Sequence, residues 1–403
     1  TWPSLRYDVR AVNQLVGRFL ATGFYYKTFI KPERLWPTYE KVLARFAHGG
    51  SISDDAGIHS AHLHRDKRYA HPDVLVAGGG PAGMVAAVAA ARAGARVQLV
   101  EEEHDLGGHL RWGGPDELAR LAELRAEVAA TGGIEVLTDS AVLGRYDDNW
   151  IAVAERSADG TERLVKARAG ALVVAVGLIE RPYVFAGNDV PGVLLSTAVR
   201  RLVNLYAVRP GERAVVLTAN ADGDAAVEDL RRVGVEIAEV VDARRGGDVV
   251  RVRGRSGVRA VELGDGRTVP ADLLVTATGW TAPTALLNQA GNRPVYVPRA
   301  ARFVPGDDLP EDVLVAGGIA GDGSLDALTG HADAVGREAA RRALARRARK
   351  LALLPTRTAP PPALAEQPPV EVPELAIDEH PELFRGRTHG IVDFSEDVSS
   401  KDI

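Results

Sequence analysis

Short, uninterrupted apolar runs alternate with helical patterns from Asp73 onward. Val74–Ala77 is the first such run, and Arg96–Val100 is the second predicted strand. Continuous apolar runs of this length are typical of strands buried on both faces of a parallel sheet. The intervening Pro81–Ala93 is rich in alanine, and Pro81 stands in the first helical turn, where its missing N–H loses no hydrogen bond. Together these three segments predict a βαβ unit.

Similar runs predict a second unit and several further strands. The second unit consists of a strand over Arg213–Leu217, a helix over Asp224–Val233 and a strand over Val235–Val241. The other predicted elements are strands over Ile134–Thr138, Trp150–Ala154, Arg163–Ala167, Ala171–Val176, Val249–Arg253, Val258–Leu263, Leu273–Thr276 and Val313–Ala316, and a helix over Leu325–Leu353. Trp150–Ala154 and Arg163–Ala167 are spaced like a hairpin.

This order of elements predicts an α/β fold with two Rossmann-like dinucleotide-binding domains, the second inserted in the first. The expected parts are an aromatic-rich N-terminal arm over 1–72, the first dinucleotide-binding domain over 73–200 and 272–354, the second domain over 201–271, and a Pro-rich linker with the start of a following domain over 355–403. The arm is expected to contain a short helix over Val9–Leu20. The chain starts at Thr1 rather than Met and stops abruptly at Ile403, so we expect a piece of a longer polypeptide.

Composition narrows the classes of partner. The 403-residue chain has 49 basic and 54 acidic residues, a net charge of −5 that argues against nucleic acid as the main partner. Without cysteine it can hold no disulfide, Fe–S cluster or thiolate zinc site. We expect no metal site, because the spacing of His59, His62, His64 and His71 fits no structural zinc pattern. There is no apolar run of eighteen residues and no recognisable signal peptide, so we expect a cytoplasmic protein without a membrane span.

The strongest candidate chemistry lies between the first predicted strand and helix. Gly78-Gly79-Gly80-Pro81-Ala82-Gly83 is a GxGxxG motif that follows a buried strand and opens a helix. Gly78 permits the tight turn, Gly80 lets a pyrophosphate approach the backbone, and Gly83 lets the helix pack on the strand. The free N–H groups and the positive dipole end of the helix favour the phosphates. A structural turn without a ligand is the weaker alternative.

Glu101 supports the same interpretation. It ends the second strand, 23 positions after Gly78, and the ribose-binding acid of such units stands about 20 residues after the motif. A carboxylate there accepts hydrogen bonds from ribose hydroxyls and repels a 2′-phosphate. FAD, NAD or another adenosine nucleotide is therefore expected, and NADP is not.

Other strand ends extend the expected site. Ala175-Val176-Gly177 and Ala277-Thr278-Gly279 each close a strand, which suits a chain that leaves and re-enters one nucleotide domain. Gly317–Asp322 follows a core strand and precedes a helix. Asp322 could accept a hydrogen bond from a ribose or ribityl hydroxyl, or it could cap that helix.

The second predicted unit departs from the motif. Its first strand is followed by Thr218-Ala219-Asn220-Ala221-Asp222-Gly223, whose side chains would crowd a pyrophosphate. Asp242 ends the second strand, where a ribose-binding acid would stand. We expect a folded Rossmann half that binds no nucleotide.

The sequence resembles a known family in three stretches. These are Pro3–Asp8 with Gly23–Phe29, Tyr69–Val76 running into the glycine motif, and Val392–Asp402. The general plan resembles the glutathione-reductase-like two-dinucleotide-binding flavoproteins. More narrowly, essentially the whole chain is similar to part of the alpha subunit of heterotetrameric sarcosine oxidase.

The resemblance implies properties that composition cannot. Such alpha subunits are longer, with a ferredoxin-like segment before this region and a glycine-cleavage-T-like, folate-binding domain after it. They hold NAD in the first nucleotide domain, whereas the beta subunit holds FAD and oxidises the amine, and FMN lies at the interface between alpha and beta. Electrons pass from sarcosine through the flavins to oxygen.

We therefore expect the NAD-binding part, or alternatively the FAD-binding part, of a heteromeric amine oxidase that is inactive alone. The residues expected at the dinucleotide are Gly78, Gly80, Pro81, Ala82, Gly83, Glu101, Glu102, Gly107, Gly108, Val142, Ala175, Gly177, Gly321 and Asp322. Lys27, among the aromatic residues of the arm, is a candidate flavin contact. The alternatives are the alpha subunit of a proline or opine dehydrogenase, a stand-alone FAD-dependent NADH reductase, and a scaffold with a structural nucleotide.

Overall fold

The computed structural model describes Val9 and residues 32–47, 65–156, 160–352, 368–393, 395 and 398–402. The chain divides into two compact units, 1–63 and 64–403, which are described separately. The described part of the first unit is chiefly a 3-10 turn, η3 (Glu33–Leu35), and helix α3 (Trp36–Ala47). The predicted helix over Val9–Leu20, apart from Val9, and the candidate Lys27 lie outside the described residues.

The second unit contains a five-stranded parallel sheet in the order β20-β8-β2-β3-β4. Its strands are β2 (Val74–Ala77), β3 (Val97–Val100), β4 (Ile134–Leu137), β8 (Ala171–Val174) and β20 (Val313–Val315). Every residue of β2, β3 and β8 is buried. The apolar runs of β2 and β8 predict this burial, and β3 also buries the polar Gln98.

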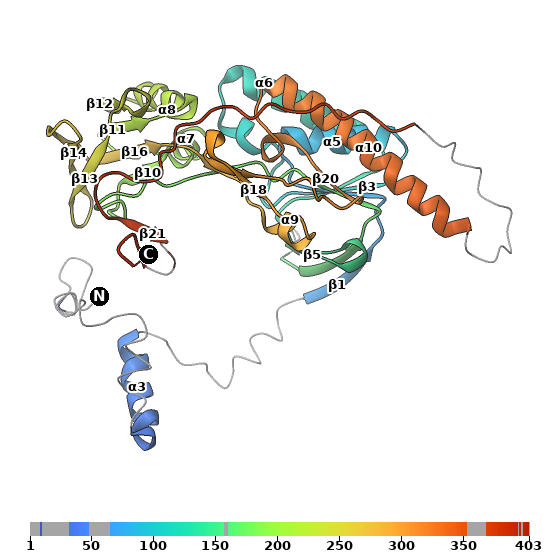
Figure 1. The fold of residues 1–403 in the computed structure, drawn as a ribbon, viewed down its shortest axis with the longest axis horizontal. Helices are drawn as coiled ribbons and strands as arrows, with labels where there is room; N and C mark the ends of the chain where they lie inside the picture. Colours follow the sequence, from blue (N-terminus) through green and yellow to red (C-terminus); the bar gives the residue numbers. More distant parts are fainter. Residues whose placement is uncertain are drawn as a thin grey trace. The chain divides into compact units, whose positions relative to one another are not determined.

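The two faces of this sheet are covered differently (Figure 1). Helices α5 (Pro81–Arg92), α6 (Pro115–Ala130) and α10 (Leu325–Ala352) cover one face, and Val74 and Val76 of β2 belong to that core. Leu75 and Ala77 belong to the opposite core, because successive side chains of a strand point to opposite faces.

A four-stranded sheet in the order β1-β7-β6-β5 covers that opposite face. Its strands are β1 (Arg65–Ala70), β5 (Ser140–Tyr146), β6 (Trp150–Arg156) and β7 (Glu162–Arg168). The predicted hairpin is confirmed by the antiparallel pairing of β6 with β7. Residues 65–70, expected within the arm, instead form a strand that runs parallel to β7.

A second parallel sheet has the order β10-β16-β11-β12. It is built from β10 (Val193–Leu195), β11 (Arg213–Thr218), β12 (Glu236–Asp242) and β16 (Leu273–Ala277), with helices α7 (Ser196–Asn204) and α8 (Ala221–Arg232). A small antiparallel sheet, β13 (Val249–Gly254), β14 (Val258–Leu263) and β15 (Thr268–Pro270), packs on it. The α/β class with Rossmann-type parallel sheets is confirmed.

Short elements complete the described chain. Two strands, β9 (Ile179–Glu180) and β17 (Trp280–Thr281), pair where the chain passes between the two parallel sheets. The others are α9 (Ala285–Gln289), the hairpin of β18 (Val295–Val297) and β19 (Arg302–Val304), the pair β21 (Ile391–Asp393) and β22 (Val398–Ser399), and 3-10 turns η4 (Gly108–Trp112), η5 (Asp147–Asn149), η6 (Ala243–Arg245), η7 (Pro298–Ala300) and η8 (Gly317–Ile319). No helix of the described residues is long and apolar enough to cross a membrane.

The C-terminal segment packs against residues 185–188, which precede strand β10 of the second parallel sheet. The Asn188 side chain donates to the carbonyl of Ile391 and accepts from its N–H, both at 2.8 Å. A Cβ on Gly390 would lie 2.0 Å from the carbonyl oxygen of Phe185, so the two backbones are in close contact. The described residues after 380, expected to begin another domain, are thus packed against this one.

Candidate dinucleotide site

The glycine motif forms the turn between β2 and α5, at the carboxyl end of the first parallel sheet. Gly78 has a φ of +107°, and a Cβ there would lie 2.4 Å from the carbonyl oxygen of Ala175. A Cβ on Gly83 would lie only 1.8 Å from the carbonyl oxygen of Gly78. Both positions therefore require glycine for conformation or packing.

Gly80 differs from its neighbours. Its φ of −68° is ordinary, and the nearest atom to a Cβ there is the Cα of Gly108, at 3.9 Å. No packing contact thus demands glycine at this position. An open surface above the backbone is the geometry that a closely approaching pyrophosphate needs.

The first turn of α5 is available to an anion. Gly80 is the N-cap and supplies no side-chain hydrogen bond, and the next residues, Pro81, Ala82 and Gly83, carry no polar side chain. Pro81 lacks an N–H, so the donors of this turn come from the residues after it. Unbonded N–H groups at the positive end of a helix dipole attract phosphate.

Glu101 lies directly beside this turn and is buried. Its Oε2 accepts the N–H of Gly79 at 2.6 Å, and its Oε1 accepts the N–H of Glu103 at 2.9 Å. Burial raises the pKa of Glu101, against the lowering effect of these two hydrogen bonds. Each carboxylate oxygen keeps a further lone pair, with which it could accept a ribose hydroxyl.

The loop after Glu101 returns to the glycine turn. The Gly107 N–H donates to the carbonyl of Gly79 at 2.8 Å, and a Cβ on Gly108 would lie 3.1 Å from the Cα of Gly80. Both glycines have positive φ, +133° and +51°. Glu102 is exposed on the same loop.

The remaining predicted residues lie at neighbouring strand ends. Ala175 follows β8 and donates its N–H to Ala77 at 2.8 Å. Gly177 has a φ of +67° with no atom within 4 Å of a Cβ position, and Val142 of β5 packs against the core between the two sheets. The fold thus brings Gly78–Gly83, Glu101, the Gly107–Gly108 loop and Ala175–Gly177 to one edge of the sheet.

Asp322 already has partners in the described chain. Its carboxylate accepts from the buried Arg302 at 2.8 Å and from the N–H of Asp378 at 3.0 Å. A Cβ on Gly321 would lie 2.5 Å from the Cβ of Leu375. The side-chain hydrogen bond to the first turn of α10 comes from Ser324, which accepts the N–H of Ala327 at 3.2 Å. Contact of Asp322 with a ribose or ribityl group stays a prediction.

The corresponding turn of the second sheet is closed to phosphate. Asn220 caps α8, its side chain accepting the N–H groups of Asp222 and Gly223 at 3.1 and 3.2 Å. The donors that would bind an anion are thus bonded within the chain. The partly buried carboxylate of Asp222 also lies at this helix start, 3.5 Å from Arg200, where it would repel a phosphate.

An ion-pair network that the sequence did not predict links helix α7, beside the second parallel sheet, to the loop after β3 of the first parallel sheet. Arg201 of α7 pairs with Glu103 at 2.5 Å, and the buried Arg111 of η4 pairs with the same carboxylate at 3.3 Å. The backbone of Glu103 in turn donates to Glu101. In the sequence, only the acidic run Glu101-Glu102-Glu103 pointed to such a network. It could not show that Arg201, distant in the sequence, would be the partner of Glu103.

Comparison with known proteins agrees with this geometry. Residues 73–147 match the model of a family described as FAD dependent oxidoreductase. The chain is 35% identical to the sarcosine oxidase subunit alpha of Rhizobium meliloti over 372 residues, covering 84% of this chain and 37% of that protein. It is also 35% identical to the sarcosine oxidase subunit alpha of a Corynebacterium species (strain P-1) over 301 residues, covering 64% of this chain and 31% of that protein.

The chain is homologous to part of the sarcosine oxidase alpha subunit. It spans about a third of the length of these curated relatives. Among solved structures, an L-proline dehydrogenase from P. horikoshii aligns with a TM-score of 0.59 and 24% identity, over 67% of this chain and 55% of that one. That likeness shows the shared fold. Among the described residues no group of three or more His, Cys, Asp or Glu side chains is placed to hold a metal ion.

Proposed function

We propose that this chain is the dinucleotide-binding part of a heteromeric, flavin-dependent amine oxidoreductase of the sarcosine oxidase type. The observation that carries the proposal is the open, uncapped Gly80 turn beside the buried Glu101 carboxylate, in a chain homologous to sarcosine oxidase alpha subunits. The reaction assigned to the whole complex is the oxidative demethylation of sarcosine to glycine with oxygen as acceptor.

The residues present fit an adenine dinucleotide. A Cβ on Gly78 or Gly83 would strike backbone, whereas the space above Gly80 is free. In this fit the first turn of α5 holds the pyrophosphate, and Glu101 accepts from the ribose of the adenosine half. The carboxylate also excludes a 2′-phosphate, so NAD is proposed, with FAD as the alternative.

The chain's own residues bind and orient this nucleotide rather than oxidise the amine. When bound, such a dinucleotide would either transfer hydride or serve a purely structural role, depending on its identity. We propose that the amine site and its FAD belong to a beta-type partner subunit and that an FMN lies at the interface with that partner. The self-capped turn at Asn220 argues against a stand-alone NADH reductase, which needs a second nucleotide site.

Chemical identification of the retained nucleotide tests this proposal. The purified chain is denatured mildly, and the released small molecules are separated and identified by mass spectrometry. NAD or FAD near one per chain is expected. Release of NADP would contradict the role of Glu101, and release of no adenine nucleotide, with none bound on titration, would contradict the proposed site.

A further inference from the structure

A cavity lies at the opposite edge of the first parallel sheet from the glycine turn. It has a volume of about 590 Å³ and lies between Gly170, which precedes β8, the Glu311–Asp312 segment, which precedes β20, and one face of α10. Because β2, β8 and β20 are parallel, their amino ends share one edge and Gly78–Gly83 lies at the other. The cavity is therefore separate from the dinucleotide site.

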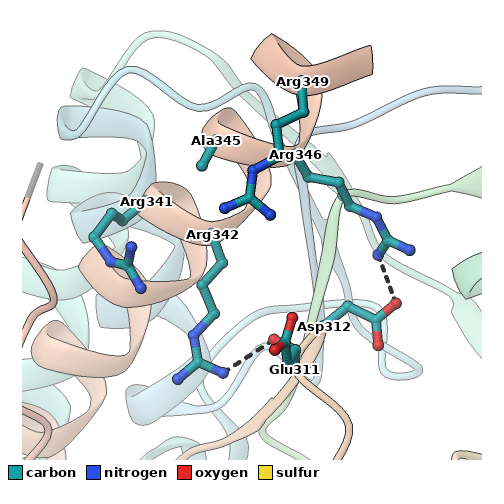
Figure 2. Close-up of a pocket in the computed structure, with 8 residues that line it drawn as sticks. Glu311, Asp312, Arg341, Arg342, Ala345, Arg346 and Arg349 are labelled. Atoms are coloured by element: carbon teal, nitrogen blue, oxygen red, sulfur yellow. Dashed lines mark hydrogen bonds and ion pairs between the residues drawn. The ribbon is translucent and has the colours of Figure 1, made fainter. Parts of the chain in front are cut away.

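Four arginines of α10 line this cavity: Arg341, Arg342, Arg346 and Arg349 (Figure 2). Their spacing of one, four and three residues places them along one side of the helix. Among the described residues, the carboxylates that line the cavity are those of Glu311 and Asp312, so the described lining carries four positive and two negative charges.

Nearby acids hold three of these arginines in place. Glu338 is almost fully buried and receives Arg341 at 2.7 Å and Arg342 at 2.6 Å. Asp312 receives Arg346 at 2.7 Å, and on its other oxygen Arg145 at 3.2 Å. Each of these two acids is thus shared by two guanidinium groups. With Arg145 and Glu338 counted beside the lining residues, five positive and three negative charges surround the cavity, so an excess of two remains.

Donors remain free in this arrangement. A guanidinium group carries five N–H donors, and the described chain engages one on Arg346 and two on Arg342. Arg349 is exposed and has no ion pair with any described residue. In Figure 2 its guanidinium group extends from α10 toward the space that Arg342 and Arg346 border.

The helix dipole is a weaker explanation for this cluster. Cations in the last turns of a helix stabilise its negative end. Arg347, in the same part of α10, pairs with Asp73 at 3.4 Å. The dipole does not require several arginines around one cavity. Held guanidinium forks with free N–H groups are the usual protein donors for phosphate and carboxylate oxygens.

We propose that this cavity binds a small polyanion with two neighbouring phosphate or carboxylate groups. The volume falls in the range of small-molecule sites. None of the described residues that line the cavity is aromatic, so recognition is of charge and not of a base. Arg349 supplies the uncommitted cation, and Arg342 and Arg346 supply preorganised donors.

Calorimetric titration of the 403-residue chain with pyrophosphate, and separately with succinate, tests the proposal at low ionic strength. Saturable binding of at least one probe is expected. Arg349→Ala should weaken it by about tenfold, as expected for loss of one charge-assisted contact. Arg337→Ala is the matched control, because Arg337 lies on the same helix, pairs with Asp333 at 2.7 Å and does not line the cavity.

Gly80→Val distinguishes this cavity from the dinucleotide turn. Pyrophosphate binding that survives in Gly80→Val and is weakened about tenfold in Arg349→Ala supports the cavity. Loss in Gly80→Val alone, equal losses in Arg337→Ala and Arg349→Ala, or no saturable binding of either probe would overturn it. Unchanged circular dichroism of each variant confirms that the fold is retained.

Discussion

At the scale of single residues, the glycines of one motif have separable roles. Gly83 serves packing, because a Cβ there would lie 1.8 Å from the Gly78 carbonyl oxygen, whereas Gly80 has open space beside it. The sequence motif predicts both positions without telling them apart. Only the fold shows which glycine the protein needs for its own stability and which one leaves room for a ligand.

Gly83→Ala is expected to destabilise the fold. The added methyl must push α5 away from the β2 turn, and overpacking that shifts the backbone costs about 1–3 kcal/mol. Denaturant unfolding measures the change. A Gly83→Ala chain as stable as the wild type would contradict the close helix–strand contact.

Glu101→Gln tests the ribose-binding role. The wild-type chain should bind NAD more tightly than NADP, and Gln should narrow the difference, because the carboxylate repels a 2′-phosphate. Burial raises the pKa of Glu101, so wild-type affinity for NAD should fall on acidification while the pH is still above the usual range of a glutamate. Titrations over pH measure both effects. Equal wild-type affinities for NAD and NADP, or the same acid dependence in Glu101→Gln, would remove Glu101 from this role.

At the scale of elements, most core strands were predictable and α6 was not foreseen. The strands β2, β3 and β8 are fully buried, and their short, mostly apolar segments predict strands of a buried parallel sheet. Helix α6 buries Leu121, Leu124 and Val128 at helical spacing, a signal that was present but weak among many charged residues. The pairing of β1 with β7, far apart in the sequence, depends on tertiary contacts that no local pattern specifies.

Helix α7 contributes to the site through Arg201, which holds Glu103 and hence the loop after Glu101. Arg201→Ala should weaken dinucleotide binding by about three- to tenfold, the usual range for a partly exposed ion pair of about 1 kcal/mol. Equilibrium titration measures this, with Arg201→Lys expected to restore part of the affinity. Arg209→Ala, which removes an exposed ion pair with Glu212, is the control, and an equal effect in both variants would contradict the positioning role.

At the scale of the whole molecule, the two parallel sheets have different roles. The first presents an uncapped helix start, and the second closes its own with Asn220. The missing glycines of the second unit led to the expectation that it binds no nucleotide, and the Asn220 cap gives that expectation a physical reason. The domain boundaries and the partner contacts of the arm stay predictions.

The chain alone is expected to lack amine oxidase activity, because the proposed amine site belongs to a partner. Sarcosine-dependent oxygen consumption, measured on the purified chain with added FAD and FMN, should stay at background. The same assay on the chain purified together with its native companion subunits should show turnover. Robust activity of the chain by itself would contradict the heteromeric assignment.

The most direct test of the central claim is the nucleotide content of Gly80→Val beside that of the wild type. A Cβ at this position has only the Cα of Gly108 within 4 Å among the described residues, at an ordinary 3.9 Å. A valine side chain would fill the space through which the pyrophosphate would approach. We predict about one adenine dinucleotide bound per wild-type chain and little or none in Gly80→Val. Once the nucleotide has been removed from both, the two chains should give closely similar unfolding curves. A Gly80→Val chain with unchanged nucleotide content would show that the dinucleotide binds elsewhere.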